Sequence, residues 1–175
     1  DQLGFTPASY GVVTLHRPSN VDNQEVLSGL LDVLLEVADR LPIVFPIHPR
    51  TLARLSEFGL MKKLNSHQGI QVLSPLGYLD FLCLTSQAKV IVTDSGGLQE
   101  ESTALGVPCL TMRENTERPI TCTLGTSTLI GNSPSELRRR LDEVLSGSYK
   151  VGKCPALWDG NAAARIVEVL MAESV

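Results

Sequence analysis

The chain has 175 residues, of which 43% are hydrophobic and 19% are charged, and its net charge is −4. This length suits one well-buried domain, and the composition is that of a globular protein and not of a disordered one. The acidic balance argues against broad nucleic-acid binding, which needs a basic face. A single diphosphate needs only a few local arginines, so an acidic protein can still bind one.

The sequence also bears on location and cofactors. No apolar run reaches membrane-spanning length, and no signal peptide opens the chain, so we expect a cytoplasmic protein without a membrane partner. The cysteines lack CxxC spacing, and we interpret them as small buried hydrophobes of a reducing compartment. They are Cys83, Cys109, Cys122 and Cys154. We expect neither a metal nor another cofactor.

Strand and helix patterns alternate along the chain. Residues 1–9 have no periodicity and resemble the remnant of a linker, and residues 18–20 (PSN) predict a turn. A long amphipathic helix capped by Asp22 or Asn23 is expected to end near Arg40. Strands are expected at residues 10–15, 43–47, 70–73, 90–92, 108–112 and 127–130. Further helices are expected at residues 51–64, 78–86, 98–105, 119–124, 135–145 and 162–171.

This alternation predicts right-handed crossovers and a doubly wound parallel sheet of the α/β class. Few aromatics, at 5%, and many Val, Leu and Ile residues favour the same fold. In such sheets the ligand crevice lies at the carboxyl ends of the strands. A polar cluster follows the last residue of several predicted strands, and we expect these clusters to lie together at the carboxyl edge of the sheet. They are His16-Arg17, His48-Pro49-Arg50, residues 94–97 and Arg113-Glu114.

The segment at residues 90–106, which is expected to form a strand, a turn and a helix, has the pattern of an anion-binding site. The buried run at residues 90–92 is followed by a Gly-Gly turn and a helix that Gly106 would cap. The first N–H groups of that helix could bind a phosphate, with Ser95 as a further donor. Glu101 lies one turn along the helix, where a carboxylate could accept both hydroxyls of a ribose. An ordinary tight turn would give the same pattern.

The strings TDSGGLQEE, LGVPCLTMR, NTERP and TLHRPSNVD resemble the non-hydrolysing UDP-N-acetylglucosamine 2-epimerases, which interconvert UDP-GlcNAc and UDP-ManNAc. The resemblance covers nearly the whole chain but only the C-terminal half of such an enzyme. It implies that residues 10–175 form a Rossmann-like UDP-binding domain, the second of two in a GT-B-like arrangement, and that the N-terminal domain is missing. It also implies a role in the biosynthesis of cell-surface polysaccharides.

The resemblance further implies a reaction. Carbon 2 of the sugar is inverted by elimination and re-addition of UDP. The proton-transferring carboxylates come from the N-terminal domain, so we expect the isolated chain to be inactive. His16 matches an active-site histidine near the diphosphate, with Arg17 beside it as a donor, whereas a strand-end histidine is otherwise an ordinary polar residue. Ser19 stands where family members commonly have Glu.

Other residues acquire roles by the same resemblance. Phe81 matches an aromatic that lies against uracil, although helix core would explain it equally. Ser95, Gly96, Gly97 and Glu101 match the phosphate turn and the ribose carboxylate. Arg118 matches an arginine that reaches the nucleotide sugar, with Glu117 orienting it, or the two form a plain surface ion pair. His48 falls where some bacterial members line an allosteric UDP-GlcNAc site, and a structural role is as good an explanation.

Three other functions remain open at this point: the donor domain of a UDP-sugar glycosyltransferase, a hydrolysing epimerase, and a nucleotide-binding regulatory module. The partner expected is UDP or one of the two UDP-sugars. The last helix carries an apolar stripe that either self-associates or folds onto the chain's own sheet, and we expect a homodimer. The stripe consists of Ala162, Ile166, Val169 and Leu170.

Overall fold

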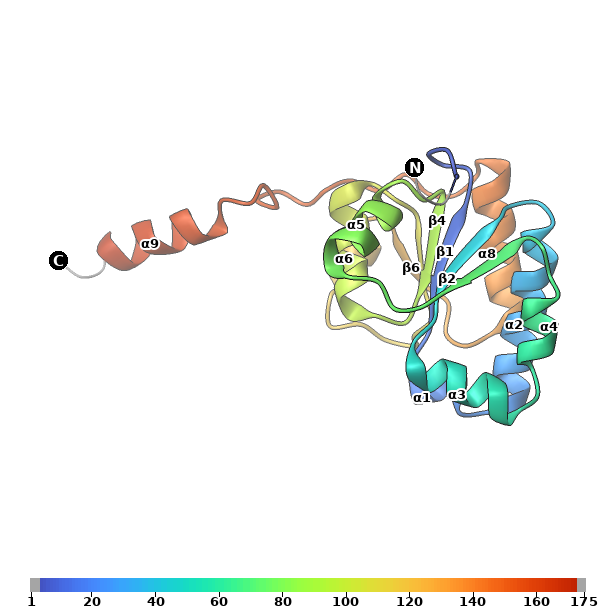
Figure 1. The fold of residues 1–175 in the computed structure, drawn as a ribbon. Helices are drawn as coiled ribbons and strands as arrows, with labels where there is room; N and C mark the ends of the chain where they lie inside the picture. The colour runs from blue at the N-terminus through green and yellow to red at the C-terminus, as the bar shows by residue number, and fades with distance from the viewer. Residues whose placement is uncertain (1–3, 173–175) are drawn as a thin grey trace.

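The computed structural model describes residues 4–172, which contain one six-stranded sheet (Figure 1). All strand pairs are parallel, and the strand order is β3-β2-β1-β4-β5-β6. The strands are β1 (Gly11–Thr14), β2 (Ile43–Pro46), β3 (Ile70–Leu73), β4 (Val90–Thr93), β5 (Cys109–Thr111) and β6 (Ser127–Leu129). The doubly wound parallel sheet predicted from the sequence is therefore confirmed.

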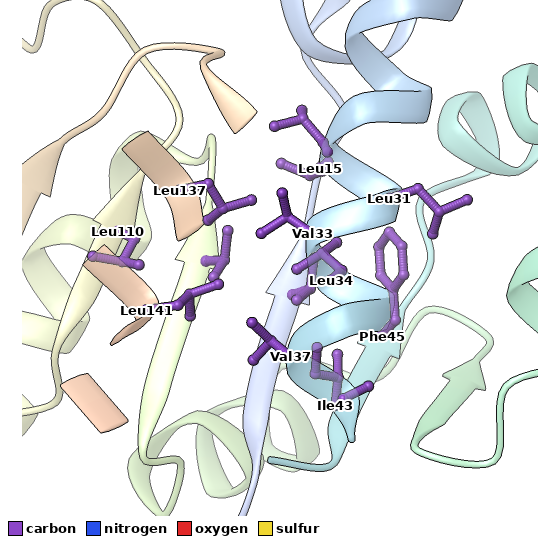
Figure 2. Packing of buried hydrophobic residues seen from close by; sticks show 14 of the residues in the cluster. Leu15, Leu31, Val33, Leu34, Val37, Ile43, Phe45, Leu110, Leu137 and Leu141 are labelled. Carbon is purple, nitrogen blue, oxygen red and sulfur yellow. The ribbon is translucent and has the colours of Figure 1, made fainter. Parts of the chain in front are cut away.

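Helices cover both faces of this sheet (Figure 1). The helices of the described residues are α1 (Pro18–Val21), α2 (Gln24–Ala38), α3 (Pro49–Glu57), α4 (Met61–Asn65), α5 (Tyr78–Ser86), α6 (Gly96–Leu105), α7 (Pro119–Thr123), α8 (Pro134–Ser146) and α9 (Ala162–Ala172), of which α9 does not contact the sheet. The larger core lies between the sheet and α2 and α8, where Leu34, Val37 and Leu137 pack together (Figure 2). The smaller core contains Leu84 of α5 and Leu98 of α6 on the opposite face.

Side-chain caps fix the starts of the two long helices. The Asn23 side chain accepts a hydrogen bond from the Val26 N–H at the start of α2, and Ser133 accepts one from Glu136 at the start of α8. The Asn23 cap is one of the two alternatives expected from the sequence. The predicted turn at residues 18–20 is instead the short helix α1, because Pro18 supplies a preset helical φ at its first position.

The predicted helix at residues 51–64 is wrong in one respect, because the structure divides it into α3 and α4. Gly59 lies between them with φ of +70°, a left-handed conformation that ends a helix and that glycine adopts at little cost. The Leu60 N–H then bonds back to the Leu55 carbonyl at 2.8 Å. Gly59, which interrupts the helical spacing of residues 51–64, therefore marks the end of a helix.

The two ends of the described chain differ in whether they pack against the domain. Phe5 packs on Tyr10 with ring centroids 5.1 Å apart, so part of the predicted linker remnant contacts the domain, while residues 1–3 lie outside the described part. The helix α9 stands away from the sheet on an extended segment and buries no residue (Figure 1). The alternative in which its stripe folds onto the sheet is therefore wrong, and self-association stays a prediction.

The cysteines differ from their predicted burial. Cys109 is buried, Cys122 is half-buried, and Cys83 and Cys154 are exposed, so the interpretation as buried hydrophobes fails for the last two. Within residues 4–172, no cluster of three or more His, Cys, Asp or Glu side chains has the arrangement of a metal site. The same residues contain no helix that is both long and apolar enough to cross a bilayer.

Candidate functional site

The site lies where the strand order reverses, between β1 and β4. From β1 the chain proceeds outward through β2 to β3, and from β4 it proceeds the other way through β5 to β6. At such a switch point the loops that follow the two central strands diverge and leave a crevice at the carboxyl edge. His16, which follows β1, lies beside His48, which follows β2, with ring centroids 5.3 Å apart. The expected meeting of these clusters at one edge is confirmed.

Asp94 joins the two central loops. It follows β4, is fully buried, and accepts hydrogen bonds from the backbone N–H of His16 at 2.9 Å and of Arg17 at 2.8 Å. The side chain of Asn20 donates to it at 3.0 Å, and Nδ1 of His16 lies 2.7 Å from it. From the sequence, Asp94 was expected only as one member of a polar cluster. A carboxylate directly after a buried strand was the signal that could have identified it as the centre of this network.

The Asp94 network sets both charge and orientation. Burial acts to raise the pKa of Asp94, but the hydrogen bonds from His16, Asn20 and the backbone N–H groups outweigh it, so the pKa is lowered. Because Nδ1 of His16 is directed at this carboxylate, its Nε2 is the nitrogen left for another partner. Arg17 is held as well, since its Nε donates to the Asp94 carbonyl at 2.9 Å.

The α6 turn presents its first amides at the same edge. Ser95 is the N-cap residue, yet its side chain makes no capping hydrogen bond. A Cβ at Gly97 would meet nothing within 4 Å, whereas one at Gly96 would lie 2.7 Å from Nη1 of Arg118. A Cβ at Gly96 would therefore displace the end of the Arg118 side chain, and at Gly97 the glycine leaves the backbone open to a ligand.

Two arginines and two glutamates surround this turn. Nε of Arg118 lies 2.7 Å from Oε2 of Glu100, and its Nη1 lies 3.6 Å from Oε2 of Glu117. Glu117 is closer to Arg113, whose Nη2 donates to Oε1 at 2.9 Å. A hydrogen bond from Arg113 lowers the pKa of Glu117. The predicted neighbour of Arg118 thus has Arg113 as its nearer partner.

A buried glutamine holds the segment that carries Arg118. Oε1 of Gln99 accepts hydrogen bonds from the hydroxyls of Thr116 at 2.8 Å and Thr121 at 3.3 Å. Thr116 in turn accepts the N–H of Arg118 at 3.0 Å. Gln99 was not among the residues expected from the sequence, because a glutamine within a helix gives no sign that it reaches a distant loop.

The remaining predicted residues lie on neighbouring elements. Glu101 is half-buried on α6, and burial together with the negative charge of Glu100 raises its pKa. Phe81 is half-buried on α5 and packs against the smaller core. His48 caps α3, where its Nδ1 accepts the Arg50 N–H at 3.1 Å. The structural role that was considered for His48 is therefore present, while a ligand role for it stays a prediction.

A parallel sheet covered on both faces, with a glycine turn at its switch point, defines a Rossmann-like α/β domain. The chain belongs to the UDP-N-acetylglucosamine 2-epimerase family, whose profile matches residues 2–171. The UDP-N-acetylglucosamine 2-epimerase of Methanococcus maripaludis is 42% identical over 166 residues, which are 94% of this chain and 45% of that protein. The chain thus spans about half the length of the curated relatives it matches.

Solved structures agree with this assignment. The crystal structure of Methanocaldococcus jannaschii UDP-GlcNAc 2-epimerase in complex with UDP-GlcNAc and UDP matches with a TM-score of 0.82 and 40% identity. That match covers 95% of this chain and 46% of the other. A heptosyltransferase of E. coli with ADP matches with a TM-score of 0.57 and 17% identity, over 81% of this chain and 46% of the other. At that identity the likeness shows the fold alone.

Proposed function

We propose that this chain is the UDP-sugar-binding half of an epimerase that interconverts UDP-GlcNAc and UDP-ManNAc. The observation that carries the proposal is the exposed α6 turn at the switch point, with Arg118 at its start and Glu101 one turn along. The name of the Methanococcus maripaludis relative and the ligands of the Methanocaldococcus jannaschii structure support the same nucleotide sugar.

Each part of the ligand has a proposed partner. The N–H groups of Gly96 and Gly97 bind the diphosphate together with the Ser95 hydroxyl, which makes no capping hydrogen bond, because helix amides and a partial positive charge favour a phosphate there. Arg118 neutralises its charge, and Arg17 lies beside the same crevice. Glu101 accepts the ribose hydroxyls. Phe81 lies against the uracil, for which its partly uncovered ring on α5 is suited.

His16 is the proposed catalytic residue of this half. In the elimination step a base removes the proton from C2, the C1–O bond breaks, and UDP leaves with the bonding electrons. Re-addition of UDP and return of a proton to the other face of C2 complete the inversion. With Nδ1 of His16 directed at Asp94, His16 protonated on both ring nitrogens would donate from Nε2 to the departing phosphate oxygen. The protein must hold UDP throughout, because UDP is not covalently attached between the two steps.

The carboxylates that move the C2 proton belong, in this proposal, to an N-terminal domain outside the chain. The chain alone is then inactive. It is a cytoplasmic protein that supplies a polysaccharide pathway, and it pairs with a second copy in the assembled enzyme. Incubation of the chain with UDP-GlcNAc in D₂O, followed by NMR, tests whether proton transfer at C2 needs residues outside the chain. Deuterium entering C2 without the N-terminal domain would contradict it.

The longer protein tests the reaction itself. With UDP-GlcNAc as the sole substrate, an epimerase produces UDP-ManNAc, and a hydrolysing epimerase produces free ManNAc and UDP. A glycosyltransferase produces nothing without an acceptor, and a regulatory module produces nothing at all. The likeness to the heptosyltransferase concerns the fold alone, so it gives the glycosyltransferase alternative no further support.

A further inference from the structure

Two guanidinium groups approach the first turn of α6 from the segment that follows β5. A Cβ at Gly96 would lie 2.7 Å from Nη1 of Arg118 and 3.4 Å from Nη1 of Arg113. Both groups therefore border the space beside the Gly96 Cα atom, where the helix also presents unpaired N–H groups and a partial positive charge. Three sources of positive charge converge at this turn.

Arg113 is the less exposed of the two arginines. Its side chain is 7% exposed, and its Nη1 is enclosed without a hydrogen-bond partner among residues 4–172. An arginine is always charged, and a buried N–H of a charged group without an acceptor is destabilising. Such an atom in a folded protein calls for an explanation, and a ligand oxygen at the Gly96 turn would supply the missing acceptor.

Glu117 lies between the two guanidinium groups. Its Oε1 is 2.9 Å from Nη2 of Arg113, and its Oε2 is 3.6 Å from Nη1 of Arg118. The Glu117 side chain is 68% exposed, and an ion pair of this kind contributes little, so Glu117 can move away at small cost. A phosphoryl group has the same acceptor chemistry as the carboxylate and offers one more oxygen.

On the basis of the nucleotide site proposed above, we propose that Arg113 is a second phosphate-binding arginine beside Arg118. In this account Glu117 bridges the two guanidinium groups only until the diphosphate of the ligand displaces it. The two residues then have opposite effects on affinity. Removing the Arg113 guanidinium weakens binding of a diphosphate, whereas neutralising Glu117 strengthens it by removing an internal competitor.

The test measures the binding of pyrophosphate, UDP and uridine to the 175-residue chain by NMR, with the amides of Gly96 and Gly97 as reporters. For Arg113→Gln we expect pyrophosphate and UDP to bind about 10- to 100-fold more weakly, as for a lost charge-assisted hydrogen bond, and uridine to bind as before. For Glu117→Gln we expect pyrophosphate to bind at least about threefold more tightly.

Two matched controls separate this effect from net charge. Glu114→Gln changes the charge equally in the same segment, so its gain in affinity should be smaller than that of Glu117→Gln. Arg138→Gln removes an arginine that pairs with Glu36 on α2, and it should leave pyrophosphate affinity unchanged. If Arg113→Gln does not fold, Arg113→Lys keeps the charge but loses the fork of donors, and it should still weaken pyrophosphate binding.

The outcomes distinguish the role proposed for Arg113 from the nucleotide site proposed above. Unchanged pyrophosphate affinity in the Arg113 variants, or weaker binding in Glu117→Gln, would overturn the inference while UDP binding by the unaltered chain upheld the nucleotide site. If pyrophosphate bound through Arg113 but UDP bound no better than pyrophosphate, the inference would stand and the nucleotide assignment would fail. Binding of neither pyrophosphate nor UDP would overturn both.

Discussion

Two ionic clusters lie at the same edge of the sheet and differ in how completely the chain satisfies them. The Asp94 carboxylate is fully buried, and every donor that reaches it comes from the chain, namely His16, Arg17 and Asn20. The second cluster consists of Arg113, Glu117 and Arg118. Nη1 of the buried Arg113 has no hydrogen-bond partner among the described residues, and Nη2 of the same side chain pairs with the exposed Glu117. The Asp94 cluster fixes the two central loops relative to each other, and we propose that the two arginines bind a phosphate.

The largest effect on the free energy of unfolding is expected for a substitution at Asp94. Asp94→Asn should lower the free energy of unfolding by about 3 kcal/mol, because it removes a buried charge that several donors face. Urea denaturation measures this loss. By NMR the Nδ1–H tautomer of His16 should give way to a mixture, since the amide no longer selects one nitrogen. Unchanged stability together with an unchanged tautomer would mean that Asp94 is not the centre of this edge.

The pH dependence of the Asp94 effect follows from its lowered pKa. A carboxyl whose pKa is lower in the folded state than in the unfolded state stabilises the protein above the unfolded pKa, and this stabilisation is lost as the pH falls through the folded pKa. The gap between the unaltered chain and Asp94→Asn should therefore be full at pH 7 and shrink below about pH 4. A gap that stayed constant to the most acidic pH at which the chain folds would contradict the charge argument.

The next largest effect is expected on nucleotide affinity, at Glu101. Glu101→Gln should weaken ribonucleotide binding by about 2 kcal/mol, because a charged acceptor for the ribose hydroxyls is lost. 2′-Deoxyuridine nucleotides should lose less, and calorimetry with both ligands measures the difference. Glu25→Gln, at an exposed position on α2, is the control. Equal losses for the two sugars would make Glu101 a structural residue.

The raised pKa of Glu101 sharpens this prediction. Uridine has no phosphate to titrate, so its affinity reports the glutamate directly. Since the ionised carboxylate is the better acceptor, uridine affinity should fall on acidification and begin to fall at a higher pH than for an ordinary glutamate. In Glu101→Gln this pH dependence should be absent.

A smaller effect is expected from Arg118 on stability. Its ion pairs with Glu100 and Glu117 lie at the surface, so Arg118→Gln should change the free energy of unfolding by under about 1 kcal/mol. The same substitution should clearly reduce UDP affinity. Thermal denaturation and calorimetry on one preparation separate the two effects. A stability loss as large as that of Asp94→Asn would erase the distinction between the clusters.

The smallest effect on stability is expected at α9, which buries no residue. Replacing Ile166 and Val169 by Ser should change the free energy of unfolding by only about 0.5 kcal/mol, because both side chains are more than half exposed. If the apolar stripe pairs two copies, the same change should abolish a dimer detected by light scattering. Val151→Ser, in the extended segment, is the control, and a dimer that survives the double replacement would exclude α9 as the interface.

The sequence predicted the elements whose signals are local. The buried strand at Val90–Thr93, the Gly106 cap and the Asn23 cap all follow from neighbouring residues, and the strand alternation then determines which loops share an edge. The partners within that edge depend on side chains distant in sequence. Asp94 reaching His16 across 78 residues, and Gln99 reaching Thr116, could not be read from periodicity.

The α6 turn and its neighbours are proposed above all to bind a uridine diphosphate. Calorimetry of the unaltered chain with UDP and CDP tests it most directly, because the two ligands differ only in the base that Phe81 is proposed to contact. We predict weak but measurable UDP binding, because in our proposal a second domain completes the cleft, and weaker CDP binding. Equal affinity for the two, or no UDP binding at millimolar concentration, would contradict it.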